Sequence, residues 1–293
     1  MATFSGHETF PFRYEWLKKG YDALQKDSNI FSKPEAIVEL GVGKNMVNSI
    51  KYWGLATGIF EKRNKEIVIT DFGHFIFDDK NGIDPYLENN STLWLLHWKI
   101  ASTEDPATTW YLAFNEFNKN FFTKEDLLEN IKLLIEKKSL KLPSENTLKR
   151  DIDVFLRSYA LKIEKDLLEE TFECPLTELN LIIEDNNFYR FNPLPSENLS
   201  LKVLAYSILE FWENHFPNKN ALSLDELIYK SGSPFKVFKM TYETFLSKII
   251  RVEKITNSAI IYDETAGIKQ LYKRKDIDKY DIYKNKNLVD VSN

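Results

Sequence analysis

Cysteine and histidine are scarce in this 293-residue sequence. The single cysteine, Cys174, excludes an internal disulfide framework and a multi-cysteine zinc site. The histidines are scattered, with no pair at the short spacing of metal ligands: His7, His74, His97 and His215. We therefore expect neither a bound metal nor a cofactor.

Long apolar runs are also missing. No stretch reaches the 18 or so apolar residues that a membrane-spanning helix needs. The first eight residues lack the basic stretch and apolar run of a signal peptide. Together with the single cysteine, these absences predict a soluble, cytoplasmic protein.

The sequence offers little for catalysis. Gly41-Val42-Gly43-Lys44 lacks the remaining glycine of a phosphate-binding loop, and no serine has the flanking glycines of a nucleophile elbow. His7-Glu8 is the one suspicious pair, and for it we favour amino-terminal packing or capping over catalysis. We predict that the protein is not an enzyme. A catalytic role for His7 and Glu8 stays open, and a pocket shared with further titratable groups would support it.

The formal net charge of −5 does not favour nucleic-acid binding, but the charges are segregated. Residues 41–66 hold five Lys/Arg against two Glu, and residues 132–150 hold six against two. Residues 269–286 hold seven Lys/Arg against three Asp. Residues 164–185 hold eight acids and one lysine, which indicates a solvated connector. Local basic patches therefore remain available for DNA.

The best candidate for a DNA reader is a winged helix-turn-helix over residues 1–80. Helices are expected at 12–24, 34–40 and 44–53, followed by strands at 58–61 and 66–70 and a helix at 71–77 that Thr70 caps. Apolar residues recur every three positions in the third helix, which leaves a polar face for phosphates and base edges. That face and the basic hairpin tip supply the predicted DNA contacts: Lys44, Asn45, Asn48, Lys51, Arg63 and Lys65. The alternative is a small packing unit with solvated charges.

A second helix-turn-helix-like unit is predicted within a helical domain at residues 81–160. Trp94, Trp98 and Trp110 indicate a buried helical core rather than a surface for stacking bases. Thr123 with Asp126 resembles a capping box, and Ser144 is a natural cap for the next helix. Near the start of that helix stand three further candidate DNA contacts: Asn146, Lys149 and Arg150. A merely solvated helix start is an equally good interpretation.

The rest of the chain is predicted to form an acidic connector with short strands at 161–195 and a winged-helix-like domain with a basic tail at 196–293. Residues 201–215 read as a helix, and Ser223 with Glu226 as a capping box before a short helix. Ile255 and residues 259–262 look strand-like. The predicted fold class is therefore mainly α with small β-hairpins, in multiple winged helix-turn-helix-like units.

The amino-terminal run from Phe4 to Gly20, FSGHETFPFRYEWLKKG, closely resembles the signature of the bacterial family called domain of unknown function 4007. Further segments resemble that family in order: LGVGKNMV from Leu40, SENTLKRD from Ser144, Cys174-Pro175-Leu176, Ser233-Pro234 with Val237-Phe238-Lys239, and ETAG from Glu264. Phe235 departs from it, since the family often has a small residue there. The resemblance implies suspected DNA binding and an association with genes of DNA sulfur modification (phosphorothioation) and phage defence.

These observations lead to a hypothesis with one main rival. We expect a DNA-binding accessory or regulatory component of a bacterial DNA modification or phage-defence system. Its partners would be DNA and, from the resemblance, an enzyme similar to phosphoadenosine phosphosulfate reductases. The rival is a scaffold whose winged-helix units dock a modification enzyme without touching DNA, and the net charge favours it.

Overall fold

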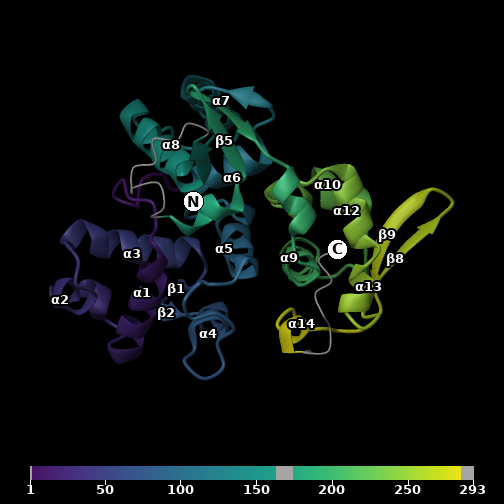
Figure 1. The fold of residues 1–293 in the computed structure, drawn as a ribbon, viewed down its shortest axis with the longest axis horizontal. Coiled ribbons are helices and arrows are strands. Elements are labelled where there is room, and N and C mark those ends of the chain that lie inside the picture. The colour runs from purple at the N-terminus through teal and green to yellow at the C-terminus, as the bar shows by residue number, and fades with distance from the viewer. Residues whose placement is uncertain (1, 163–173, 285–293) are drawn as a thin grey trace. The chain divides into compact units, whose positions relative to one another are not determined.

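A computed structural model describes residues 2–162 and 174–284. The chain divides into two compact units, Met1–Asn192 and Pro193–Asn293 (Figure 1). About half of it is helical and the sheets are small, which confirms the expected class of mainly α with β. Among the described residues, no helix has both the length and the apolar character to cross a membrane.

The first unit opens with helices and a hairpin, in the order α1 (Tyr14–Lys26), α2 (Ala36–Leu40), α3 (Lys44–Ala56), β1 (Phe60–Arg63), β2 (Glu66–Ile69) and α4 (Asp71–Phe77). β1 and β2 are antiparallel, with Arg63 opposite Glu66. Asn64 and Lys65 form the two-residue turn with φ of 51° and 72°, the positive values that suit the twist of a hairpin. Thr70 caps α4 by accepting a hydrogen bond from the Gly73 amide, as predicted.

The first unit continues as α5 (Asn90–Ser102), α6 (Thr108–Asn115), β3 (Phe121–Phe122), α7 (Lys124–Lys137), α8 (Glu145–Tyr159), β4 (Ala160–Lys162), β5 (Ile182–Asp185) and β6 (Phe188–Phe191). The strands form one sheet in the order β3-β6-β5-β4, in which β4 and β5 are parallel. Of the predicted acidic connector, residues 163–173 lie outside the described residues. The part from β5 to β6 belongs to this sheet.

The helix caps and the buried tryptophans of this region agree with those predicted from the sequence. The capping box of Thr123 and Asp126 begins α7, and the Ser144 side chain caps α8. The three tryptophans of α5 and α6 are buried, as expected of a helical core.

The second unit contains α9 (Leu201–His215), β7 (Ala221–Ser223), α10 (Leu224–Tyr229), α11 (Pro234–Val237), α12 (Tyr242–Ile249), α13 (Val252–Ile255), β8 (Ile260–Thr265), β9 (Ile268–Lys273) and α14 (Asp281–Lys284). Its strands form a sheet in the order β7-β9-β8, with both pairs antiparallel. The capping box of Ser223 and Glu226 is present.

The prediction of a strand at Ile255 was wrong, because this residue ends α13. Val252 and Ile255 are three residues apart and both buried, so one turn of helix points both into the core. This packing overrides the preference of β-branched side chains for strands.

Candidate nucleic-acid interface

The helix α3 has the two faces that its sequence predicts. Val47, Ile50 and Trp53 are buried. Lys44 and Asn45 are exposed, and the next two predicted contacts along the helix, Asn48 and Lys51, are half-buried. The apolar face therefore fixes the helix while its polar face borders the solvent.

The residues Ser5–Thr9, here called the amino-terminal loop, lie against α3. The Asn48 amide donates to Glu8 Oε1 at 3.3 Å, and Ser49 Oγ donates to the carbonyl oxygen of His7 at 3.0 Å. Gly6 packs on the Tyr52 ring so closely that a Cβ atom at this glycine would lie 2.4 Å from Tyr52 Cδ2. Only glycine permits this approach.

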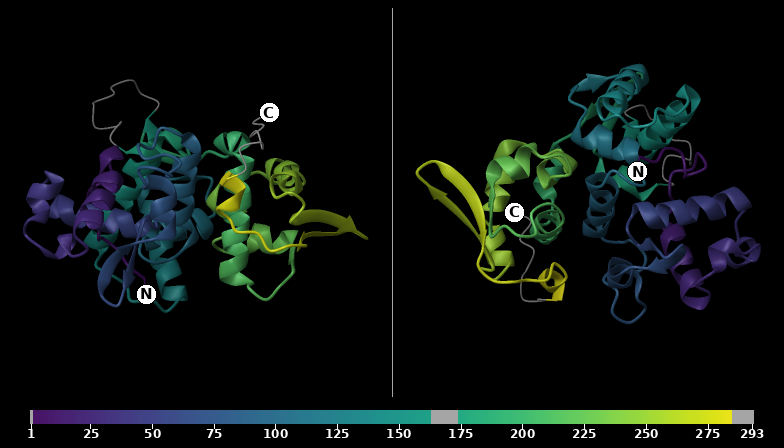
Figure 2. Two further views of the ribbon diagram at one scale, coloured as in Figure 1. Left: turned by 90° about the horizontal axis from the view of Figure 1, so that it is seen from below. Right: turned by 180° about the vertical axis from the view of Figure 1, so that it is seen from behind.

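The same loop is tied to α8. His7 Nε2 lies 2.7 Å from Asp151 Oδ1, and the Ser5 amide donates to that oxygen at 2.7 Å. The Arg157 guanidinium donates to the carbonyl oxygen of Thr9. In Figures 1 and 2 the purple amino-terminal segment accordingly runs between α3 and α8. The loop thus joins the two helices on which DNA contacts were predicted.

The His7 side chain is 0% exposed and its hydrogen bonds define its tautomer. The Thr9 amide donates to His7 Nδ1 at 3.1 Å, so Nε2 carries the proton and donates it to the Asp151 carboxylate. The ring packs against Trp53 and Trp110, with centroids 6.3 and 5.9 Å away. We call the His7–Asp151 pair the buried latch.

Glu8 does not share the environment of His7. It is exposed and accepts from Asn48 on α3, whereas His7 pairs with Asp151 on α8. The two neighbours therefore do not form the dyad that general acid–base chemistry would require.

The exposed side of α8 carries the other predicted contacts, since Asn146, Lys149 and Arg150 are all exposed. Two adjoining pockets lie along this helix and share Lys124 and Asp153. The larger has a volume of about 370 Å³ and is lined by Thr9, Lys124, Arg150, Asp153, Val154 and Arg157. We call it the arginine pocket.

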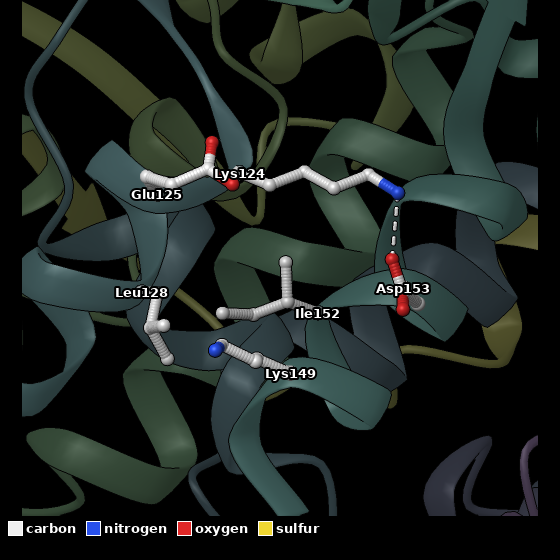
Figure 3. A pocket seen from close by; sticks show the side chains of 6 residues that line it. All are labelled: Lys124, Glu125, Leu128, Lys149, Ile152 and Asp153. Carbon is white, nitrogen blue, oxygen red and sulfur yellow. Dashed lines mark hydrogen bonds and ion pairs between the residues drawn. The ribbon is translucent and has the colours of Figure 1, made fainter. Parts of the chain in front are cut away.

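The smaller pocket, of about 240 Å³, is shown in Figure 3. Lys124 extends from the start of α7 to Asp153 on α8, and the two form an ion pair of 2.7 Å. Leu128 and Ile152 give this pocket an apolar side. Its two lysines, Lys124 and Lys149, are balanced by Glu125 and Asp153, so this pocket has no excess of positive charge.

The predicted cations differ in whether they have partners. Arg63 pairs with Glu61, and Lys149 pairs with Glu145 at 2.7 Å. Four other predicted cations form no ion pair within residues 2–162 and 174–284: Lys44, Lys51, Lys65 and Arg150. Exposed ion pairs contribute little, so the paired cations can also turn to a phosphate. The unpaired ones can do so without first leaving a carboxylate.

Sequence reasoning missed Lys124, Asp151 and Arg157. Arg157 follows Arg150 by seven residues, two helical turns, so helical spacing alone could have placed it on the same face. Lys124 and Asp151 depend on the packing of α7 and of the amino-terminal loop against α8, which no local spacing reveals.

The second unit differs from the first in the charges on its helix α12 and on its β8–β9 hairpin. Glu243 stands in the first turn of α12, and Asp263 and Glu264 lie on β8 next to the hairpin tip. Large apolar or aromatic side chains are exposed nearby in the sequence: Tyr229, Tyr242, Ile250 and Ile268. The helix α12 does not carry the exposed cations that α3 has, since its one cation, Lys248, is buried.

Cys174 is buried, and burial raises the pKa of its thiol to about 12. Because the thiolate is the reactive form, we expect the folded protein to react with a disulfide reagent at pH 8 more than about a hundredfold slower than a free thiol. A spectroscopic thiol assay with and without denaturant measures this. Fast reaction of the folded chain would show that the thiol is accessible.

Among the described residues, no group of three or more His, Cys, Asp or Glu side chains is placed to hold a metal ion.

The fold and the candidate interface define a mainly helical protein of two units, whose first unit carries cations on two helices joined by the amino-terminal loop. The chain belongs to the family described as "Protein of unknown function (DUF4007)", whose model matches residues 4–286. The resemblance noted in the sequence is thus confirmed.

Two solved structures are similar to the chain over most of its length. A crystal structure of SspB has a TM-score of 0.82 and 27% identity, covering 93% of this chain and 84% of that one. A crystal structure of magnesium-ion-bound SspB has a TM-score of 0.81 and 27% identity, covering 93% and 83%. No curated protein matched the chain.

Proposed function

We propose that the protein is a non-enzymatic DNA-binding component of a bacterial DNA modification or phage-defence system. The observation that carries the proposal is the joining of α3 and α8 by the amino-terminal loop, through Asn48–Glu8 on one side and Arg157–Thr9 on the other. Asn48 and Arg150, one from each of the two sets of predicted DNA contacts, thereby lie beside the same loop. The similarity to SspB, a phosphorothioation-associated protein, supports a role in a DNA modification system.

In this proposal the segment from α1 to α4 is a winged helix-turn-helix. α3 would be the recognition helix, since it follows α2 after a tight turn at Gly41, which has φ of 65°. The β1–β2 hairpin would be the wing, with Lys65 at its tip reaching an adjacent phosphate. The second unit has a partly similar order of α9, β7, α10, α11 and α12, but the short helix α13 separates α12 from the β8–β9 hairpin.

The second unit favours a second candidate function, the docking of a protein. Its carboxylates near the hairpin tip would repel a phosphate backbone, whereas exposed Tyr229, Tyr242 and Ile268 suit a protein surface. The partner we infer is a modification enzyme, such as one similar to phosphoadenosine phosphosulfate reductases. DNA contact by the first unit and protein docking by the second are compatible.

The DNA-binding proposal predicts a salt-dependent affinity that depends on the unpaired cations. We expect replacement of Lys44, Lys51 and Lys65 by alanine to weaken binding to a mixed-sequence duplex at least tenfold. The slope of log affinity against log salt should fall by roughly 0.9 for each phosphate that the variant no longer neutralises. Fluorescence anisotropy across a series from low to physiological salt measures both quantities.

The matched control replaces Lys19, Lys26 and Lys33, which form ion pairs with Glu15, Glu39 and Asp27. It removes the same number of charges and should retain most of the affinity. Equal weakening in both variants would mean that only total charge matters. If the unaltered protein binds no duplex even at low salt, general DNA affinity is excluded and the docking role alone remains.

A further inference from the structure

The arginine pocket combines an excess of positive charge with a defined shape. Arg150, Arg157 and Lys124 line it against the single carboxylate of Asp153. Lys124 already pairs with Asp153 at 2.7 Å, which leaves the two arginine charges without a carboxylate in the pocket. Such an arrangement attracts a small anion rather than a cation or an apolar ligand.

The two guanidinium groups are placed differently. Arg157 donates to the Thr9 carbonyl oxygen, and that oxygen belongs to the loop that the buried latch holds on α8. A guanidinium group has five N–H donors, so one anchored to a carbonyl keeps others for a ligand. The buried latch therefore positions Arg157 without using up its capacity to bind.

Arg150 has no ion pair among the described residues and stands seven residues before Arg157 on α8. Seven residues of helix rise about 10.5 Å, so both guanidinium groups can reach a phosphate-sized anion that enters the pocket between them. The planar fork of arginine suits the oxygens of a phosphate better than an ammonium group does.

We propose that the arginine pocket binds one phosphate of the DNA backbone, with Arg150 and Arg157 as its ligands and the Thr9 carbonyl as the group that orients Arg157. This inference rests on the proposed function and adds a specific phosphate contact on α8 to the one expected on α3. The phosphate fixes the register of the duplex relative to the amino-terminal loop, since backbone contacts position DNA and carry no sequence information.

The test compares three double variants of the full chain on the same mixed-sequence duplex across a salt series. Replacement of Arg150 and Arg157 by alanine should weaken binding at least tenfold and lower the salt slope by about 0.9, the value for a single phosphate. Replacement of both by lysine should also weaken binding severalfold, because the charge remains but the forked geometry is absent. The matched control, Lys80 and Lys137 replaced by alanine, should bind like the unaltered protein.

Each other outcome overturns the inference in a distinct way. A slope change of about 1.8 would mean that the arginines contact two separate phosphates. Full affinity in the lysine variant would mean that the pocket contributes only its positive charge and not the forked geometry of arginine. If the unaltered protein binds DNA and the alanine variant binds equally well, the pocket is not a phosphate site, but the proposed function still holds. If the unaltered protein does not bind DNA, both the phosphate site and the DNA-binding proposal are excluded.

Discussion

Replacing His7 by alanine should lower the free energy of unfolding of the first unit by about 3 kcal/mol or more, because the buried Asp151 carboxylate loses one of its two hydrogen-bond donors and the missing imidazole leaves a cavity. Asp151 is 1% exposed, and without His7 only the Ser5 amide would still donate to its Oδ1 atom. The cavity would lie beside Trp53 and Trp110, whose rings pack on the imidazole.

Replacing Asp151 by asparagine should cost far less, about 1 kcal/mol. Both hydrogen bonds of this carboxylate reach the same atom, Oδ1, from the His7 ring and the Ser5 amide. The amide oxygen of asparagine can accept both, because the tautomer of His7 makes it a neutral donor. Only the added strength of a charged acceptor would disappear.

Urea unfolding followed by tryptophan fluorescence measures both variants. Trp212 is the only tryptophan of the second unit in the sequence, so the signal comes mostly from the first. The two units can unfold in separate transitions, and the comparison uses the one that His7 shifts. Equal destabilisation of the two variants would show that the negative charge of Asp151 stabilises the latch. A decrease below about 1 kcal/mol for the alanine variant would show that the latch contributes little.

The helix faces and caps could be predicted because their causes are local. The polar and apolar faces of α3 follow from a period of 3.6 residues, and Thr123, Ser144 and Ser223 cap the amide groups of the residues that follow them. The hairpin itself was also predicted, but its tip was placed at residues 62–65, whereas Lys62 and Arg63 belong to β1 and only Asn64 and Lys65 form the turn. Of the predicted contacts on α3 and the hairpin, Lys44, Asn45, Arg63 and Lys65 are exposed, whereas Asn48 and Lys51 are half-buried.

The joining of α3 to α8 could not be predicted in the same way. His7 and Asp151 are 144 residues apart in the sequence, and nothing near either residue indicates the other. The parallel pairing of β4 with β5 is also non-local, and it places part of the predicted connector in the sheet of the first unit. The arginine pocket depends on both α7 and the amino-terminal loop, so only Arg150 of its lining was predicted.

Gly54→Ala should be the most damaging single-methyl substitution in α3, with a decrease of about 3 kcal/mol in the free energy of unfolding. A Cβ atom at this glycine would lie 2.0 Å from Cδ2 and 2.1 Å from Cε2 of Phe60. Phe60 is 1% exposed and has no free space to move into, so α3 and β1 would have to separate. The close contact between Gly54 and Phe60 holds the hairpin of the proposed wing against the proposed recognition helix.

Gly43→Ala is the matched control on the same helix. This glycine precedes α3 with an ordinary φ of −70°, and no atom lies within 4 Å of the position its Cβ would take. Its cost should stay below about 1 kcal/mol, the scale of a changed N-cap residue. Thermal or urea unfolding of the two variants gives the comparison. Similar stabilities would mean that Phe60 can move away from α3, and that the hairpin is held to the helix by other contacts. A large difference would show that the close approach at Gly54 holds the β1–β2 hairpin against α3.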